Sequence, residues 1–224
     1  MSFVTYTNKV NIGVLGTGDV GKQLSKAFLT EGNPTMIGTR DVNKAEVVAF
    51  KTANPAISIG TFEETVKFAD IVVLAVGGAI AQELVKSLAS VLSGKVVIDA
   101  VNPITPGVPP KKFALQYFTE KNSSLMELLI EAAPEAHFVK AFNSVGNGLM
   151  YKPQLSERAS MIVCGDSDEA KKSVQPLIEA FGWDFFDVGA STLAGPVEAL
   201  CPLWCAIAFK TGKFNDFAFK IVTK

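Results

Sequence analysis

Short apolar runs alternate with amphipathic stretches through the first 190 residues of the chain. The runs ADIVVLAV and GKVVIDAV are continuous, rich in β-branched residues and bounded by turn residues, which is typical of strands buried on both faces of a parallel sheet. The apolar runs predict strands at 10–15, 35–37, 57–59, 71–76, 96–99, 138–141, 161–164 and 183–186. The amphipathic stretches predict helices at 20–30, 44–53, 62–68, 79–92, 124–133 and 167–181. This alternation predicts an α/β fold with a doubly wound, mostly parallel sheet.

The strand pattern ends after residue 190. Residues 192–210 and 213–222 each predict a helix, so we expect an α/β domain at 1–190 and a helical appendage at 191–224. Pro202 is expected to kink the helix that contains it, whereas Ser167 is expected to cap the start of its helix. The proline-rich stretch VNPITPGVPPKK predicts a loop, and long loops often cover a binding site.

Composition excludes several classes of function. With 21 Lys and Arg against 22 Asp and Glu, the chain lacks the basic surface that nucleic-acid binding needs, so no nucleic-acid partner is expected. No apolar run was found that reaches the roughly 18 residues of a membrane span, and the N-terminus lacks the pattern of a signal peptide. The three cysteines form no disulfide framework, so we expect a cytoplasmic protein without a membrane partner.

A glycine motif follows the first predicted strand. VLGTGDVGKQL places Gly16, Gly18 and Gly21 in the spacing G-x-G-x-x-G, between a strand and a helix. In this context Gly16 makes the tight turn, Gly18 lets the backbone approach a pyrophosphate, and Gly21 lets helix and strand pack closely. A glycine-rich turn without a ligand is the alternative. The context favours a Rossmann-type dinucleotide-binding domain, with the helix N-terminus facing the phosphates.

The end of the second predicted strand indicates which cofactor binds. NAD-binding domains usually carry Asp or Glu about 20 residues after the motif, to bind the ribose 2′-OH. Here Arg40 follows Gly21 by 19 residues and is preceded by Thr39, with Lys44 one helical turn further. Arg can form bidentate, charge-assisted bonds with a 2′-phosphate, which a carboxylate would repel. The sequence therefore predicts NADP(H), although Asp41 offers a carboxylate for the ribose if the strand ends later.

The motifs GTGDVG, IGTRD, VVLAV, VIDAVNP, VKAFNSVG, EALCPLW and DFAFKIV together resemble one family. This family is the deazaflavin (factor 420)-dependent NADP oxidoreductases, and the chain is also similar to the NADPH domain of six-transmembrane metalloreductases. The resemblance spans nearly the whole chain. It implies that the loop Gly16, Thr17, Gly18, Asp19, Val20 and Gly21 binds the pyrophosphate, and that Thr39, Arg40 and Lys44 bind the 2′-phosphate. It also implies that Ala75, Val76 and Gly77 line the dinucleotide, and that Asn102, Pro103, Ala141 and Asn143 border the nicotinamide.

Two departures from the family lie on the acceptor side of the site. The chain has Gly77-Gly78 where many relatives carry Pro and an aromatic residue, and Gly195 where relatives often carry Arg. Hydride transfer between a nicotinamide and a flavin-like ring needs positioning rather than acid–base catalysis, so no catalytic residue is assigned. His137 is expected to be an ordinary strand-end histidine, with a proton donor as the alternative. Lys140 is expected to be structural or solvent-facing, with a catalytic role as the alternative.

The sequence therefore predicts an NADP-dependent oxidoreductase with a deazaflavin or flavin as the second substrate. The alternatives are a reductase of a small carbonyl or imine, and an NADPH-sensing module without turnover. Cys201 and Cys205 lie four residues apart without further ligands nearby, so packing is favoured and no metal is expected. The apolar appendage, with Trp204 and Phe209, favours burial against a second subunit, which predicts a homodimer.

Overall fold

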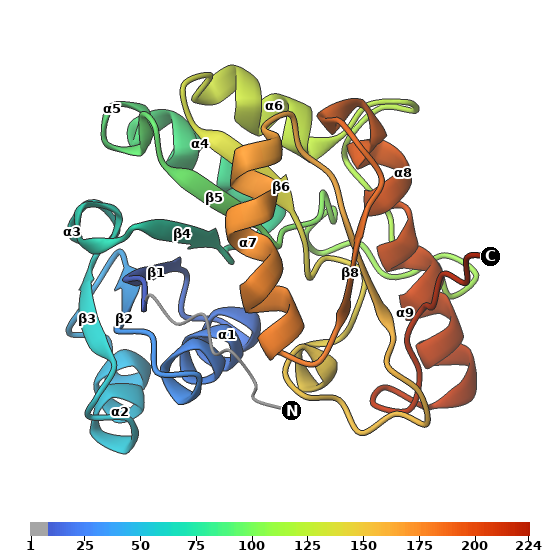
Figure 1. The fold of residues 1–224 in the computed structure, drawn as a ribbon, viewed down its shortest axis with the longest axis horizontal. Helices are drawn as coiled ribbons and strands as arrows, with labels where there is room; N and C mark the ends of the chain where they lie inside the picture. Colours follow the sequence, from blue (N-terminus) through green and yellow to red (C-terminus); the bar gives the residue numbers. More distant parts are fainter. Residues whose placement is uncertain (1–8) are drawn as a thin grey trace.

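The structure is a computed structural model that describes residues 9–224 (Figure 1). Most of the N-terminal stretch on which the expected absence of a signal peptide rests therefore lies outside the described residues. Six parallel strands form the main sheet in the order β3-β2-β1-β4-β5-β6. They are β1 (Ile12–Leu15), β2 (Thr35–Thr39), β3 (Ser58–Thr61), β4 (Ile71–Leu74), β5 (Val96–Asp99) and β6 (His137–Lys140). The strand order reverses between β1 and β4, where such sheets bind their ligands.

Two further strands, β7 (Ser160–Val163) and β8 (Asp184–Asp187), pair in parallel in a separate small sheet. The small sheet meets the main one through an antiparallel bridge between Lys140 and Cys164. All eight predicted strands are present in the structure, with bounds within two residues of the predictions. The long apolar runs were reliable because strands buried on both faces leave no polar alternation to misread.

Helices cover both faces of the main sheet, as Figure 1 shows. They are α1 (Asp19–Thr30), α2 (Ala45–Ala53), α3 (Phe62–Phe68), α4 (Gly78–Ser87), α5 (Ala89–Leu92), α6 (Leu125–Ala132) and α7 (Asp168–Ala180). Successive strand residues point to opposite faces, so Val73 packs in the core with α1 and α7, whereas Val72 and Leu74 pack in the core with α3, α4 and α6. The predicted doubly wound, Rossmann-type α/β fold is confirmed. Ser167 accepts a hydrogen bond from the backbone N–H of Ala170 and caps α7, as predicted.

The predicted helix at 213–222 is wrong, because this segment has a bend at 214–216 and no regular secondary structure in the rest. Gly212 adopts a left-handed conformation with φ of 71° and ends the preceding helix. The segment then runs beside β7, where the Ser160 N–H donates to the carbonyl of Phe219 over 3.0 Å. The indole of Trp204 stacks on Phe217 with 5.3 Å between the ring centroids, so tertiary contacts outweigh the local helical pattern.

The predicted helices at 79–92 and 192–210 are each divided. The first becomes α4 and α5, which meet at Leu88. The second becomes η2 (Ser191–Leu193), α8 (Ala194–Glu198) and α9 (Leu200–Thr211), with Ala199 between the last two. Pro202 has no N–H to donate to the carbonyl of Glu198 four residues earlier, and the helical segment is interrupted at Ala199, between these two residues, in agreement with the predicted kink.

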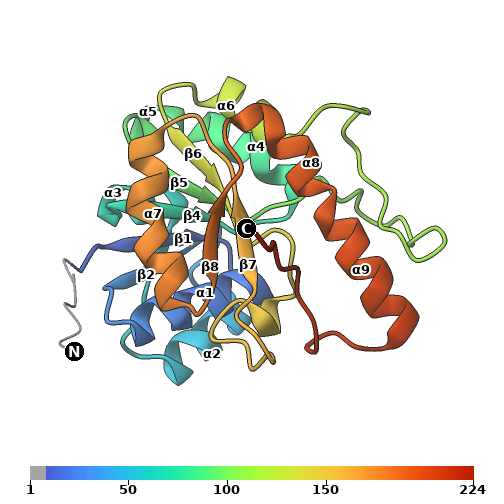
Figure 2. The ribbon, with the colours of Figure 1, turned by 45° about the vertical axis from the view of Figure 1, so that its right-hand side comes forward.

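The helical segment Ser191–Thr211 is long and apolar enough to cross a membrane by length and composition, which contradicts the expectation that no run reaches that limit. About a third of its most apolar window is buried inside the protein. Figure 2 shows α8 and α9 beside the small sheet, and Figure 1 shows them on the opposite side of the molecule from β3. The side chains of Glu198 and Trp204 are buried there.

Candidate dinucleotide-binding site

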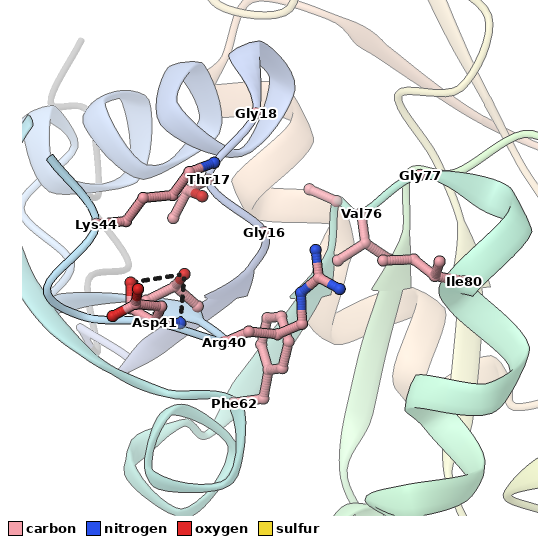
Figure 3. Close-up of a pocket in the computed structure, with 12 residues that line it drawn as sticks. Gly16, Thr17, Gly18, Arg40, Asp41, Lys44, Phe62, Val76, Gly77 and Ile80 are labelled. Atoms are coloured by element: carbon pink, nitrogen blue, oxygen red, sulfur yellow. Dashed lines mark hydrogen bonds between the residues drawn. The ribbon is translucent and has the colours of Figure 1, made fainter. Parts of the chain in front are cut away.

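A cleft of about 520 Å³ lies at the carboxyl ends of β1, β2 and β4 (Figure 3). This volume lies within the range of roughly 300–1,000 Å³ that is typical of small-molecule sites. The cleft is lined by Gly16, Thr17, Gly18, Thr39, Arg40, Asp41, Lys44, Phe62, Ala75, Val76, Gly77 and Ile80. Most of the predicted pyrophosphate and 2′-phosphate residues therefore come together in one place.

The glycine loop has the geometry that phosphate binding requires. Gly16 has φ of +122°, which a residue with a side chain rarely adopts. A Cβ on Gly18 would meet nothing within 4 Å, so the backbone there faces open space. Gly18 also precedes the first turn of α1 and provides no side-chain cap, which leaves backbone N–H groups of that turn free for an anion. Gly21 has a packing role instead, because its Cβ would lie 1.9 Å from the carbonyl oxygen of Gly16.

Arg40 is the cation best placed for a phosphate at the other end of this cleft. Figure 3 shows its exposed side chain extending past Phe62 towards Val76 and Ile80. No salt bridge engages Arg40 within residues 9–224, so its guanidinium is available to a ligand. The guanidinium can therefore bind a phosphate without first giving up a carboxylate.

The other predicted phosphate ligands have partners already. The Lys44 Nζ lies 2.7 Å from a carboxylate oxygen of Glu46, so it would have to exchange that exposed pair for a phosphate. The Thr39 hydroxyl accepts a hydrogen bond from the Asp41 N–H over 3.3 Å. Asp41 itself lines the cleft, so the ribose contact that the sequence left open remains geometrically available to it.

A second cavity of about 450 Å³ continues the cleft towards β5 and shares Gly18, Ala75, Val76 and Gly77 with the first. Its further lining residues are Asp19, Val20, Gly78, Ala79, Ala100, Val101, Asn102, Ile104 and Pro106. This end is mainly apolar, which suits a nicotinamide ring and a second ring stacked on it. Gly78 is required by close packing, because its Cβ would lie 2.0 Å from the carbonyl oxygen of Asn102.

Some predicted residues lie behind the cleft rather than in its wall. Pro103, Ala141 and Asn143 line neither cavity. Asn143 is buried and supports Asn102, whose side-chain amide donates to the Asn143 carbonyl over 2.8 Å. Phe62, Ile80, Ile104 and Pro106 contribute to the walls but were not singled out, since an apolar residue at the start of a helix or in a loop carries no sequence signal for a ligand.

The remaining candidate side chains lie away from the cavities. His137 is exposed at the amino end of β6, the sheet edge opposite the cleft, which contradicts the proton-donor alternative and agrees with an ordinary strand-end histidine. Cys201 is buried and Cys205 half-buried, in agreement with packing. Burial raises the pKa of the Cys164 thiol to about 12, so this group stays neutral and unreactive at neutral pH. Lys140 is fully buried and structural, not solvent-facing.

A parallel sheet in this order, a glycine turn before α1 and a cleft at the strand ends define a Rossmann-type dinucleotide-binding protein. Residues 11–103 match the family described as NADP oxidoreductase, coenzyme F420-dependent. A solved structure described as a putative F420-dependent NADP-reductase from Arthrobacter sp. FB24 superimposes with a TM-score of 0.86 at 28% identity, over 96% of this chain and 100% of that one.

Two curated relatives agree with this family match. The metalloreductase STEAP3 of Rattus norvegicus is 29% identical over 198 residues, which cover 86% of this chain and 37% of that protein. The F420-dependent NADP reductase of Methanocaldococcus jannaschii is 28% identical over 149 residues, or 66% of each chain. The chain thus spans little more than a third of the first and about two thirds of the second. These findings confirm the predicted resemblance. The matched family and the archaeal relative are both NADP oxidoreductases, which is the class of enzyme that the sequence predicts.

Replacing Arg40 tests the phosphate end of the cleft. Arg40→Ala is expected to weaken NADPH binding about 10- to 100-fold, the loss of one or two hydrogen bonds to a charged group. NADH, which lacks the 2′-phosphate, should keep its affinity within about a factor of three. Calorimetric titration of both nucleotides measures the two effects. Lys86→Ala, at the far end of α4, is the matched control and should change neither. A wild type that binds NADH as tightly as NADPH would instead assign the ribose to Asp41.

Proposed function

We propose that the chain is an NADP(H)-binding oxidoreductase that transfers hydride between the nicotinamide and a deazaflavin or flavin-type acceptor. The observation that carries this proposal is a continuous cleft with two chemically different ends. One end has Arg40 and Lys44 beside a glycine turn, and the other is apolar and bounded by Gly77, Ala100 and Ile104. The polar end fits a 2′-phosphorylated adenosine, and the apolar end fits stacked rings.

The residues of the apolar end act by positioning. The bound dinucleotide supplies the hydride, and this chain needs to hold two rings face to face and keep water away. The cavity walls near β4 and β5 are made of glycine, alanine and valine, which leave room for flat rings. Tyr117 borders this region but has little capacity to act as a base, because burial raises the pKa of its hydroxyl far above the usual value. Hydride transfer between rings needs no general base.

Turnover with a panel of acceptors tests the proposed function. Purified protein is mixed with NADPH and, in separate reactions, FMN, FAD, a deazaflavin, a small imine and a small carbonyl compound. The loss of reduced-nicotinamide absorbance is followed against a heat-denatured control. Faster oxidation with a flavin or deazaflavin than with the other compounds supports the proposal. If only the imine or the carbonyl compound oxidises NADPH, the acceptor is not a flavin and the proposal is wrong on this point. Tight NADPH binding without any oxidation would favour a sensing module.

We also propose that the protein works as a homodimer in the cytoplasm, with α9 at the interface. Leu203 and Ile207 lie four residues apart on one face of α9 and are 51% and 36% exposed. Two such apolar side chains on one helix face favour burial against a second copy. The variant with both Leu203→Glu and Ile207→Glu is expected to be a monomer with unchanged NADPH affinity, measured by native mass and titration. A monomeric wild type would contradict this proposal.

A further inference from the structure

A buried ion cluster lies at the carboxyl edge of the sheet, beneath the apolar end of the cleft. Asp99 and Lys140 are the last residues of β5 and β6, and they are paired in the strand register. The Lys140 Nζ lies 2.6 Å from Asp99 Oδ2 and 2.8 Å from Glu198 Oε1 on α8, and it donates to the Val101 carbonyl over 3.1 Å. The three charged side chains are almost completely buried. The cluster therefore connects two adjacent strands of the sheet to the C-terminal helices.

Glu198 makes further contacts that depend on its negative charge. Its Oε2 accepts from the N–H of Leu125 over 3.0 Å, and its Oε1 accepts from the N–H of Met126 over 3.1 Å, at the start of α6. The three described groups that bond to this carboxylate, the N–H groups of Leu125 and Met126 and the ammonium of Lys140, are thus all donors. An amide at position 198 would have to turn its NH₂ group towards one of these donors, whichever way it rotated.

Each part of this cluster is close in the chain to a residue that shapes the cleft. Asn102 lies three residues after Asp99 and lines the cavity. Asn143, three residues after Lys140, donates from its side chain to the carbonyl of Val197 over 3.0 Å. The Tyr117 hydroxyl donates to the Glu198 carbonyl over 2.8 Å, and its loop carries Ile104 in the cavity wall. A shift of α8 would therefore reach the cavity wall through two hydrogen bonds, one at the Val197 carbonyl and one at the Glu198 carbonyl.

The Lys140 ammonium stays charged throughout the neutral range. Burial alone would lower the pKa of Lys140, but the adjacent Asp99 and Glu198 carboxylates outweigh that effect and raise it above its usual value. The buried Lys140 ammonium is paired with both carboxylates, so neither Asp99 nor Glu198 can move away without leaving a buried charge without its partner. The three side chains are therefore held in one arrangement.

We propose that Lys140 and Glu198 are positioning residues that hold α8 against the sheet edge and thereby fix the shape of the nicotinamide end of the cleft. They contact neither cavity themselves and act through Asn102, Asn143 and Tyr117. This inference rests on the proposed function, since it assigns the nicotinamide to the apolar end. It assigns no role to the pair at the adenosine end, which is formed mainly by the glycine loop before α1 and by the residues at and after the end of β2.

Two ligands separate the ends of the cleft without any need for turnover. Adenosine 2′,5′-bisphosphate carries only the adenosine half, whereas NADPH reaches both ends. Glu198→Gln is expected to weaken NADPH binding about 3- to 10-fold, equivalent to one lost hydrogen bond. The affinity for the bisphosphate should stay within about a factor of two. If the flavin reaction occurs, its kcat should fall about tenfold or more, because a misplacement of about 1 Å can cost ~10²-fold in rate.

Asp187→Asn provides the matched control. Asp187 pairs with buried Lys171 over 2.9 Å on α7, outside both cavities, and the substitution makes the same carboxylate-to-amide change. This variant should bind both ligands as the wild type does. Equal loss of both ligands in Glu198→Gln, or loss of neither, overturns the positioning role. A wild type that binds neither ligand overturns the proposed function instead. Lys140→Arg, which keeps the positive charge, should bind NADPH with an affinity closer to that of the wild type than Lys140→Met does.

Discussion

The variant Gly18→Val is expected to lose NADPH binding by about 100-fold or more while unfolding at the same temperature as the wild type. A Cβ at this position meets no atom within 4 Å, and the backbone angles of −75° and −178° suit any residue. The valine side chain would fill the space where a pyrophosphate approaches the N-terminus of α1. Losing two or more hydrogen bonds to charged phosphate oxygens accounts for an effect of about this size.

Gly21→Val is the matched control for this prediction, because it makes the same change one helical turn away. A Cβ on Gly21 would lie 1.9 Å from the Gly16 carbonyl oxygen, so this variant should be destabilised. Thermal unfolding and NADPH titration of both variants measure the two effects separately. Wild-type NADPH affinity in Gly18→Val would mean that the glycine loop does not bind the dinucleotide.

Lys140→Met is expected to lower the free energy of unfolding by about 3–5 kcal/mol, because it leaves two buried carboxylates without their cation. The methionine fills most of the lysine volume, so the effect reports the charge rather than a cavity. Urea unfolding at neutral pH measures it. Lys171→Met is the control, since the carboxylates of Asp168 and Asp187 are partly exposed and water can solvate them once the lysine is removed. Its cost should be about 1 kcal/mol. Equal costs in the two variants would contradict the role of the buried charge.

The stabilisation by Lys140 also has a defined dependence on pH. Because its folded-state pKa is raised, the contribution is fully present below the usual value of 10.5. It is lost only as the pH rises through the higher pKa of the folded protein. Wild-type stability should therefore show no Lys140 transition across the neutral range, and a loss at strongly alkaline pH that is absent from Lys140→Met.

The fold could be predicted from sequence because its strands are continuous apolar runs and its first turn carries three glycines. The segment after Gly212 was misread for a local reason. Phe217, Phe219 and Ile221 are spaced by two, which is a strand-like alternation, but the preceding apolar helix favoured a second helix. The stacking of Phe217 on Trp204 holds this segment in a non-helical conformation. The two residues are 13 positions apart, so a local sequence pattern does not reveal their contact.

The phosphate end of the site was equally accessible to sequence reasoning, because Arg40 and the glycine loop have a fixed distance along the chain. The supporting residues were not. Glu198 is 58 residues from Lys140 and lies among apolar residues, so only the three-dimensional structure reveals that they are ion-paired. Phe62 and Ile104 likewise become part of the cavity wall through the packing of distant elements.

The two tryptophans of this chain lie in different parts of the molecule, and this has an optical consequence. Trp183 is buried in the core, where its indole N–H donates to the Met150 carbonyl over 3.0 Å. Trp204 belongs to α9 and packs against the C-terminal segment, where its indole N–H donates to the Phe217 carbonyl over 3.1 Å. Fluorescence emission therefore contains one signal from the core and one from the helix–tail contact. With Trp183→Phe or Trp204→Phe, either signal can be recorded alone. Loosening of the C-terminal helices is then observed as a shift of the Trp204 emission maximum, without an attached dye.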